Sequence, residues 1–334
     1  MRAADRLSFR VDEGETLGLV GESGCGKSIT ALALLRLVPP PGRITAGRII
    51  YKGTDLTALP EKRMRRYRGK EIALVFQEPM AALNPVFTVG YQIAEGLIVH
   101  KMMRKREALL EAARLMEIVR IPDAARRARD YPHQLSGGLR QRVMIAMALA
   151  CRPSLVIADE PTTALDVTIQ AEILDLLRRL KDEYRLSLIL ISHNLGVIAE
   201  TADRIAVMYA GRIVETAPVR ELFSAPGHPY TVGLLRSVPR LGEGGLDARG
   251  RKKRLSAIPG QVPDLARLPA GCAFNPRCPD VMSECRDTEP ALLPVGDVRS
   301  GAAAGGRDSP DPAVLRPVRA VACFKHHDVE GRPR

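Results

Sequence analysis

Apolar residues in this chain gather into short runs of strand length, separated by longer amphipathic segments. Four such runs are TLGLVG at 16–21, IALVFQ at 72–77, LVIADE at 155–160 and SLILIS at 187–192. Runs of this length, bounded by polar or turn residues, predict buried strands. The segment RIAVMYAGRIVETA at 204–217 contains two strand-like runs about an Ala-Gly pair and predicts a hairpin.

Two other segments have the three- and four-residue spacing of an amphipathic helix, 167–184 and 105–119. The predicted apolar faces are Ile169, Ile173, Leu176, Leu177 and Leu180 in the first, and Leu109, Ala112, Leu115, Met116 and Val119 in the second. Such faces pack into the core and carry no chemistry. Strands that alternate with helices predict an α/β fold, with a mostly parallel sheet flanked by helices.

Length and composition restrict the class of protein. With 334 residues, 46% of them hydrophobic and 26% charged, the chain has the composition of a globular protein with one large domain and an appendage, or two domains. No apolar stretch reaches the ~18 residues of a membrane-spanning helix, and the first residues lack the apolar core of a signal peptide. After about residue 235 the amino-acid composition changes. Residues 241–254 have the composition of a linker, and residues 294–312 have that of a disordered segment.

The formal net charge of +12 comes from basic clusters at 62–70, 101–106, 126–129 and 251–254. Nucleic-acid binding is one interpretation of such clusters. However, the chain has no Trp and only 4% aromatic residues, so it offers few platforms on which single-stranded bases can stack. A solvated basic surface, which also suits a position near anionic lipid, is the favoured interpretation.

The segment GESGCGKS at 21–28 matches the phosphate-loop pattern G-x-x-x-x-G-K-[ST], and it lies between a predicted strand and a predicted helix at 28–38. Its glycines allow backbone angles that turn successive N–H groups toward phosphate oxygens. Lys27 would reach the β- and γ-phosphates, and the Ser28 hydroxyl would contact Mg²⁺. The predicted ATP-binding residues are Gly21, Glu22, Ser23, Gly24, Cys25, Gly26, Lys27 and Ser28.

A second element supports nucleotide chemistry. The run SLVIADEP places Asp159 and Glu160 at the carboxyl end of a predicted strand, where one carboxylate can hold Mg²⁺ and the next can polarise an attacking water. Together with the phosphate loop, this pair indicates a nucleoside triphosphatase. The segment LSGGLRQR at 135–142 has the pattern of a second phosphate cradle, which one domain does not need for itself.

The ordered set of a phosphate loop, FQEP, LSGG, ADEP, ALD and ISH resembles the ATP-binding subunit of an ABC transporter over about residues 7–240. The resemblance implies a P-loop NTPase of the ABC ATPase type with a helical signature subdomain. It also implies that Ser136, Gly137 and Gly138 bind the γ-phosphate held by another subunit. Two anion-binding helix ends would then clamp one triphosphate, and two chains meeting head to tail would form two composite sites.

The resemblance implies further roles at matching positions. Glu160 would be the general base, and His193 would contact the γ-phosphate. Gln77 would contact Mg²⁺ and the attacking water and would lie in the loop that responds to the transmembrane subunits. Asp166 would couple the two sites across the dimer interface. The implied Mg²⁺ ligands are Ser28, Gln77 and Asp159.

Narrower resemblances indicate a branch of that family. The segments 76–93, 131–150 and 228–235 are similar to the dipeptide and oligopeptide importer ATPases, a group that includes nickel importers. The segment 258–279 is similar to the C-terminal extension of that group. We therefore predict an ATP-binding domain over 1–235 and a C-terminal oligopeptide-transporter extension over 236–334.

This resemblance implies an ATPase that powers peptide import from the cytoplasmic face of a bacterial membrane. The implied partners are a second ATPase subunit, related or identical, two transmembrane permeases and an external solute-binding protein; no nucleic acid is expected. Import of nickel or another small solute is an alternative. A soluble ABC ATPase acting on nucleic acid or ribosomes is disfavoured because the chain has one phosphate loop and no heptad run. A regulatory subunit without turnover is disfavoured because Lys27, Gln77, Glu160 and His193 are all present.

The chain departs from the family pattern in two places. The family begins with a strand and an adenine-packing residue upstream of SFRVDEGE, and here Met1 lies only a few residues before that segment. Either the start codon is assigned too far downstream or this protein holds adenine weakly, and we favour the first interpretation. In the segment EPMAALNP, Ala81 and Ala82 replace a more usual Thr-Ser pair.

The six cysteines fall into two groups. Cys25 and Cys151 are expected to be small buried residues. Four cysteines near the C-terminus suit either a tetrahedral zinc site or a [4Fe–4S] cluster, and a site without metal is the third alternative. The absence of short C-x₂-C pairs favours the cluster, which the family resemblance also implies. These cysteines are Cys272, Cys278, Cys285 and Cys323.

Overall fold

The computed structural model describes residues 1–100, 102–163, 165–238, 257–295 and 319–332. These residues form two compact units. The first, here called the signature unit, comprises Arg10–Gly18 and Ser28–Ser192. The second, here called the phosphate-loop unit, comprises Met1–Phe9, Leu19–Lys27 and His193–Arg334. Strand β1, Thr16–Val20, and helix α1, Lys27–Leu34, run across the two boundaries along the chain.

The signature unit is built on three parallel strands, in the order β4-β5-β6. They are β4, Ile72–Val75, β5, Leu155–Asp159, and β6, Ser187–Ser192, and all three were predicted. Their register aligns Val75 with Ala158, and Asp159 with Ile191. The carboxyl ends of all three strands therefore meet at one edge of the sheet, which brings together residues far apart in the sequence.

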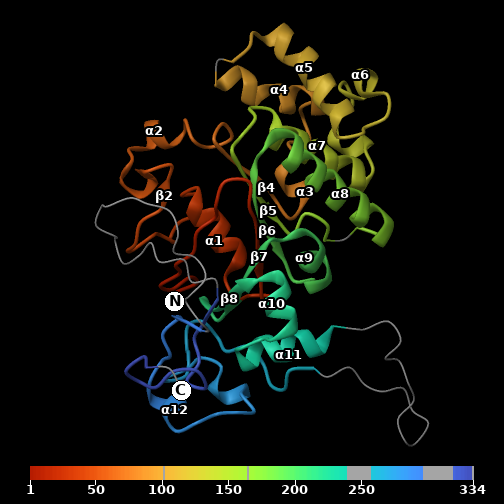
Figure 1. Cartoon of the computed structure of the whole chain (residues 1–334). Helices are drawn as coiled ribbons and strands as arrows, with labels where there is room; N and C mark the ends of the chain where they lie inside the picture. Colours follow the sequence, from red (N-terminus) through yellow and green to blue (C-terminus); the bar gives the residue numbers. More distant parts are fainter. Residues whose placement is uncertain (101, 164, 239–256, 296–318, 333–334) are drawn as a thin grey trace, which may run out of the picture. The chain divides into compact units, whose positions relative to one another are not determined.

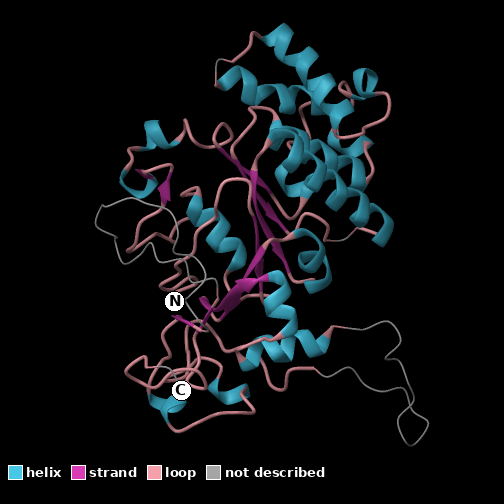
Figure 2. Cartoon of the chain, viewed as in Figure 1, coloured by secondary structure: helices cyan, strands magenta, loops and turns pink. Residues whose placement is uncertain are grey.

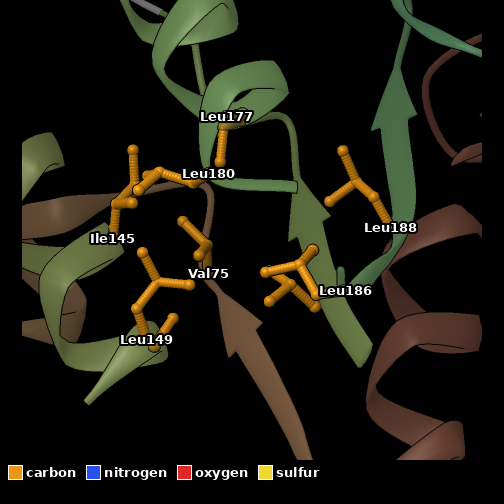
Figure 3. Close-up of a pocket in the computed structure, with 9 residues that line it drawn as sticks. Val75, Ile145, Leu149, Leu177, Leu180, Leu186 and Leu188 are labelled. Carbon is orange, nitrogen blue, oxygen red and sulfur yellow. The ribbon is translucent and has the colours of Figure 1, made fainter. Parts of the chain in front are cut away.

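Helices cover the strands of the signature unit (Figure 2). Side chains from β4, β6, α7 (Gly137–Leu149) and α8 (Val167–Tyr184) surround a small aliphatic cavity, as Figure 3 shows. Every residue lining it is Val, Ile, Leu or Ala, so the cavity is part of the hydrophobic core and offers no polar group to a ligand. Helix α8 has the predicted limits, and four of its five predicted core residues are buried: Ile173, Leu176, Leu177 and Leu180.

Helices α4, Val89–Val99, α5, Lys105–Ile118, and α6, Ala124–Arg127, lie together, with α7 next to α4 and α5 (Figure 1). The predicted apolar face of α5 is correct at Ala112, Leu115 and Met116, and Val119, which caps the helix, is buried too. The prediction is wrong at Leu109, which is 37% exposed, whereas Ala108 is buried. The buried face of α5 therefore includes Ala108 in place of Leu109.

Shorter elements complete the signature unit. The predicted helix after the phosphate loop ends at Leu34, earlier than expected, because Arg36 takes a left-handed conformation (φ 53°) and the Leu37 N–H turns back to the Leu32 carbonyl. The remaining elements are β2, Ile50–Tyr51, β3, Thr54–Asp55, the 3₁₀ turn η1, Leu56–Ala58, α2, Glu61–Met64, α3, Pro79–Ala82, and η2, Pro132–Gln134.

The phosphate-loop unit contains the predicted hairpin, β7, Arg204–Tyr209, and β8, Arg212–Pro218. Its two-residue turn has positive φ at both Ala210 and Gly211, as a type I′ hairpin requires. Two short strands continue the sheet in the order β8-β10-β9: β10 is Ala320–Val321 and β9 is Leu293–Pro294. The C-terminal extension therefore extends the sheet of the ATP-binding part of the chain.

The helices of this unit are α9, Leu195–Thr201, α10, Val219–Ser224, α11, Pro229–Ser237, the 3₁₀ turn η3, Asn275–Arg277, and α12, Glu284–Asp287. Among the described residues, no helix combines the length and apolar character needed to cross a membrane. The predicted linker at 241–254, the basic cluster at 251–254 and residues 296–312 of the predicted disordered segment lie outside the described residues.

Candidate functional site

The predicted phosphate loop, residues 21–28, joins β1 to α1. Lys27 is buried, and its ammonium group donates hydrogen bonds to the Gly21 carbonyl at 2.9 Å and the Glu22 carbonyl at 3.1 Å. The cation is thus held inside the turn of the loop, at the N-terminus of α1. This arrangement of a lysine and a helix N-terminus suits a phosphate group.

Two glycines of the loop are required by close backbone approaches. A Cβ atom at Gly21 would lie 2.3 Å from the Met208 carbonyl oxygen of β7, and one at Gly26, whose φ is 103°, would lie 2.2 Å from the Ala3 carbonyl oxygen. Neither distance is sterically allowed, so any larger residue would displace the loop. The loop conformation therefore depends on its packing against β7 and the N-terminal segment.

Glu22 connects the loop to more distant parts of the phosphate-loop unit. Its backbone N–H donates to the hydroxyl of Tyr230 at 2.8 Å. Its carboxylate accepts two hydrogen bonds from the guanidinium of Arg277, at 2.7 and 3.0 Å. Tyr230 lies in α11 and Arg277 in η3, so both come from chain segments C-terminal to the hairpin.

In the signature unit, the carboxyl ends of β4 and β5 bring Gln77 and Glu160 together, as the register requires. The Gln77 amide donates to Glu160 Oε2 at 3.1 Å, and the Thr163 hydroxyl donates to the same oxygen at 2.8 Å. Asp159, the last residue of β5, is buried. One carboxylate is thus oriented by two neutral donors, with a second carboxylate adjacent in sequence.

Glu160 has a left-handed backbone conformation, with φ 45°. This region costs free energy for any residue other than glycine, and such strain is concentrated at functional sites. The Glu160 N–H donates to the Ile191 carbonyl of β6 at 3.0 Å, which holds the strained residue in place. The backbone therefore aims this side chain in a direction that regular strand geometry would not allow.

The predicted signature residues lie at the N-terminus of α7. Ser136 is exposed and caps the helix by accepting from the Leu139 N–H, and Gly137 and Gly138 form its first turn. A Cβ at Gly138 would lie 2.9 Å from Cγ2 of Ile169 in α8. Asp166 is exposed and caps α8 in the same way. The N-terminal turns of two helices, with positive ends suited to anions, therefore lie side by side.

His193 directly follows β6 and belongs to the phosphate-loop unit. Its side chain is exposed, and the next residue, Asn194, caps α9 by accepting from the N–H groups of Gly196 and Val197. The capping geometry holds the backbone of this turn and leaves the imidazole at the surface.

The four C-terminal cysteines line a single pocket of the phosphate-loop unit, together with His228, Phe274 and Asp280. Burial raises the pKa of the Cys272 and Cys278 thiols to about 11, and the neighbouring cysteines add to the shift. The fold thus brings together cysteines that are separated by up to 37 residues in sequence. These are the four cysteines that the sequence analysis grouped as candidate ligands of one site.

Among the residues that the structure describes, no group of three or more His, Cys, Asp or Glu side chains has the geometry to hold a metal ion. The four C-terminal cysteines line one pocket without forming such a group, so the cluster and the zinc site both stay predictions. Cys25 and Cys151 are buried, as predicted, and burial raises the pKa of both thiols.

Sequence reasoning did not single out three residues of the site: Thr163, Tyr230 and Arg277. Thr163 lies three residues after the predicted base, a spacing that a local turn brings into contact. Tyr230 lies within the segment 228–235 and Arg277 within the segment 258–279, but no pattern in either segment points to the phosphate loop.

Two family models match the chain. The model described as ABC transporter matches residues 4–163, and the model described as oligopeptide/dipeptide transporter, C-terminal region, matches residues 214–285. A putative peptide import ATP-binding protein of Brucella melitensis is 55% identical over 299 residues, 88% of this chain and 88% of that protein. A probable peptide ABC transporter ATP-binding protein of Sinorhizobium fredii is 52% identical over 329 residues, 98% of this chain and 90% of that protein.

Two solved structures of the ATP-binding cassette MJ0796 have a similar fold. The dimeric structure of its post-hydrolysis state, bound to ADP and Pi, has a TM-score of 0.59 and 28% sequence identity, covering 65% of this chain and 91% of that chain. Another dimeric structure of the same cassette has a TM-score of 0.57, 29% identity and the same coverage. The cassette whose fold this chain resembles has therefore been observed with ADP and Pi bound.

Proposed function

Because this chain belongs to the ATP-binding proteins of ABC transporters, we propose that it hydrolyses ATP to power the uptake of dipeptides or oligopeptides. Peptide cargo is supported by the names of the relatives and by the match of the C-terminal region. The observation that carries the hydrolytic role is the oriented carboxylate of Glu160, which accepts from Gln77 and Thr163.

The phosphate loop binds ATP in this proposal. Lys27 releases the carbonyls of its own loop and donates to the β- and γ-phosphates. The oxygen donors of Ser28, Gln77 and Asp159 suit the hard cation Mg²⁺, which prefers carboxylate, hydroxyl and amide oxygens. When bound, Mg²⁺ neutralises charge that develops on the phosphate oxygens.

Glu160 acts as the general base. Its carboxylate, oriented by Gln77 and Thr163, accepts a proton from the attacking water. Gln77 turns its amide toward the same carboxylate and orients the water. His193, exposed at the turn after β6, donates to the γ-phosphate.

The signature residues Ser136, Gly137 and Gly138 serve the ATP held by a second ATPase subunit, related or identical. The exposure of Ser136 and Gly137 at a helix N-terminus, beside the exposed cap Asp166, supports a surface that a partner covers. The proposal includes two composite sites at the interface of a head-to-tail dimer, with Asp166 coupling them.

The segment after β4 transmits the motion to two permease subunits at the cytoplasmic face of the membrane; an external solute-binding protein delivers the cargo. Large apolar side chains are exposed along this segment: Phe76, Met80, Val86 and Phe87 are 43–70% exposed. Such side chains clustered in one loop segment favour a protein partner. The segment also begins next to Gln77, so the partner surface and the hydrolytic site share one stretch of chain.

The pocket lined by Cys272, Cys278, Cys285 and Cys323 is proposed to hold a [4Fe–4S] cluster. Four thiols, the first and last of them 51 positions apart in the sequence, lie around one cavity and match the number and type of ligands that such a cluster takes. When bound, the cluster supplies four Fe–S bonds that cross-link these segments. Anaerobically purified protein should contain about four irons per chain, and Cys285→Ser should lose iron and melt at a lower temperature; a chain purified without iron or visible absorption would exclude the cluster.

The function is tested by uptake in cells whose chromosomal copy carries Glu160→Gln. A labelled dipeptide, a labelled longer peptide and nickel are supplied separately. We expect loss of peptide uptake with nickel uptake retained. Loss of nickel uptake alone would assign the protein to nickel import, and unchanged uptake of all three would remove the peptide assignment.

A matched control is Glu183→Gln, an exposed carboxylate near the end of α8. It removes the same charge in the same unit, so uptake should be that of the wild type. Purified wild-type protein should hydrolyse ATP when it is assembled with its permeases, and the Glu160→Gln assembly should bind ATP without turnover.

A further inference from the structure

The contact between Arg277 and Glu22 connects the C-terminal extension to the phosphate loop across 255 residues of sequence. The two groups form a bidentate pair, in which Nη1 and Nη2 of the guanidinium each donate to one carboxylate oxygen, at 2.7 and 3.0 Å. Paired donors of this kind fix the orientation of both partners. The side chain of Arg277 is 4% exposed and that of Glu22 is 27% exposed, so water screens the pair less than it screens a surface pair.

Arg277 is itself held firmly by the extension. Its Nε donates to the Pro259 carbonyl at 2.9 Å, and its guanidinium lies over the rings of Tyr209 and Phe274, at 5.8 and 5.9 Å. At Gly260, where φ is 77°, an added Cβ would lie 3.2 Å from Cγ of Arg277. The guanidinium is therefore positioned by the extension together with Tyr209 of β7.

Glu22 occupies a central place in the loop. Its carbonyl accepts from both the Lys27 ammonium and the Cys25 N–H, while its own N–H donates to Tyr230. A shift of Glu22 would therefore move the carbonyl oxygens that place the ammonium of Lys27. The carboxylate would also add an uncompensated negative charge beside a triphosphate if Arg277 did not neutralise it.

We propose that Arg277 is a positioning residue, through which the C-terminal extension keeps the phosphate loop in its ATP-binding conformation. This inference rests on the proposed binding of ATP by the loop. Arg277 is not proposed to contact nucleotide; it acts through Glu22. Because only the binding-competent conformation takes up ATP, a loop that populates it less binds ATP more weakly, with chemistry after binding unchanged.

The first test measures ATP binding and hydrolysis by the assembled transporter carrying Arg277→Gln. We expect the KM for ATP to rise about tenfold, with kcat within about twofold of the wild type. Arg277→Lys keeps the charge but loses the bidentate geometry, so its KM should lie between those of the wild type and Arg277→Gln. In the double variant with Glu22→Gln the unpaired carboxylate is gone, so its KM should fall below that of Arg277→Gln.

The second test follows loop opening without nucleotide. Cys25 is fully buried in the loop, and Cys151 is a buried thiol of the signature unit. Peptide mapping after alkylation should show faster labelling of Cys25 in Arg277→Gln, by about tenfold, with Cys151 unchanged. Arg286→Gln, an exposed arginine of α12, is the matched control and should leave both rates and the KM unchanged.

The proposal would be overturned if both Arg277→Gln and Arg277→Lys had the KM for ATP and the rate of Cys25 labelling of the wild type. A lower melting temperature with an unchanged KM and an unchanged labelling rate would likewise overturn the proposal. The Arg277–Glu22 pair would then only stabilise the packing of the extension. If the wild type does not bind ATP, or if Lys27→Ala binds ATP as tightly as the wild type, the proposed function fails instead. The Cys25 labelling comparison does not depend on ATP and still tests the coupling.

Discussion

The phosphate loop and the turn at the carboxyl end of β5 both follow a strand and carry candidate ATP-site residues, but they are held in different ways. The loop depends on residues distant in sequence: Tyr230 binds the Glu22 N–H and Arg277 binds its carboxylate. At the end of β5, Glu160 is held by Thr163, three residues away, and by Gln77, which lies two residues after the end of the neighbouring strand β4.

This difference indicates that the two regions affect different steps, hydrolysis at the end of β5 and ATP binding at the loop. Glu160 is oriented within the fold common to the ATPase part of the chain, so its chemistry does not require the extension. The loop that receives ATP is held by residues that belong to the region matched by the oligopeptide/dipeptide transporter C-terminal model. We therefore expect changes at β5 to alter kcat, and changes at the contacts of the loop to alter the affinity for ATP.

The largest effect should come from Glu160→Gln. Loss of a general base typically costs about 10² to 10⁴ in rate, so kcat should fall by that factor while ATP remains bound. Single-turnover hydrolysis and equilibrium ATP binding of the assembled transporter separate the two quantities. Residual turnover within a factor of five of the wild type would assign the base to another residue.

Gln77→Ala should have the next largest effect. It removes one of the two donors to Glu160 and the amide proposed to orient water, so kcat should fall about tenfold, equivalent to about 1.4 kcal/mol in barrier height. The ATP KM should stay within about twofold. A rise in KM without a change in kcat would contradict the division between the two regions.

Tyr230→Phe tests the loop by removing one hydroxyl. Tyr230 is fully buried, and the Glu22 N–H would lose its acceptor, which costs about 1–3 kcal/mol of stability for a buried polar group. We expect a lower melting temperature, and an ATP KM raised about fivefold because the loop populates its competent conformation less. Thermal unfolding and steady-state kinetics check both; a drop in kcat alone would show that the loop also takes part in chemistry.

Thr163→Val should have the smallest effect. It keeps the shape of the side chain and removes the second donor to Glu160, leaving Gln77 in place. The expected fall in kcat is about threefold, less than 1 kcal/mol, with unchanged KM. Thr163→Ser, which keeps the hydroxyl, should behave as the wild type. Equal losses in both variants would show that packing, rather than the hydrogen bond, accounts for the role of Thr163.

Local sequence was informative wherever one period or one motif was enough. The limits of α8, the four strands and the hairpin follow from the spacing of apolar residues and from an Ala-Gly turn. These features depend on neighbours a few residues away, which is why the sequence alone predicts them.

The exposure of Leu109, the gathering of the four C-terminal thiols and the pairing of Arg277 with Glu22 were decided by tertiary structure. Helical periodicity does not specify which side of a wide apolar face the neighbouring helices cover. A buried arginine has no sequence pattern that names its carboxylate, because any of several acidic residues would satisfy it. The sequence by itself therefore determined the elements and the chemical groups of the site, whereas the packing of distant segments decided which residues hold those groups in place.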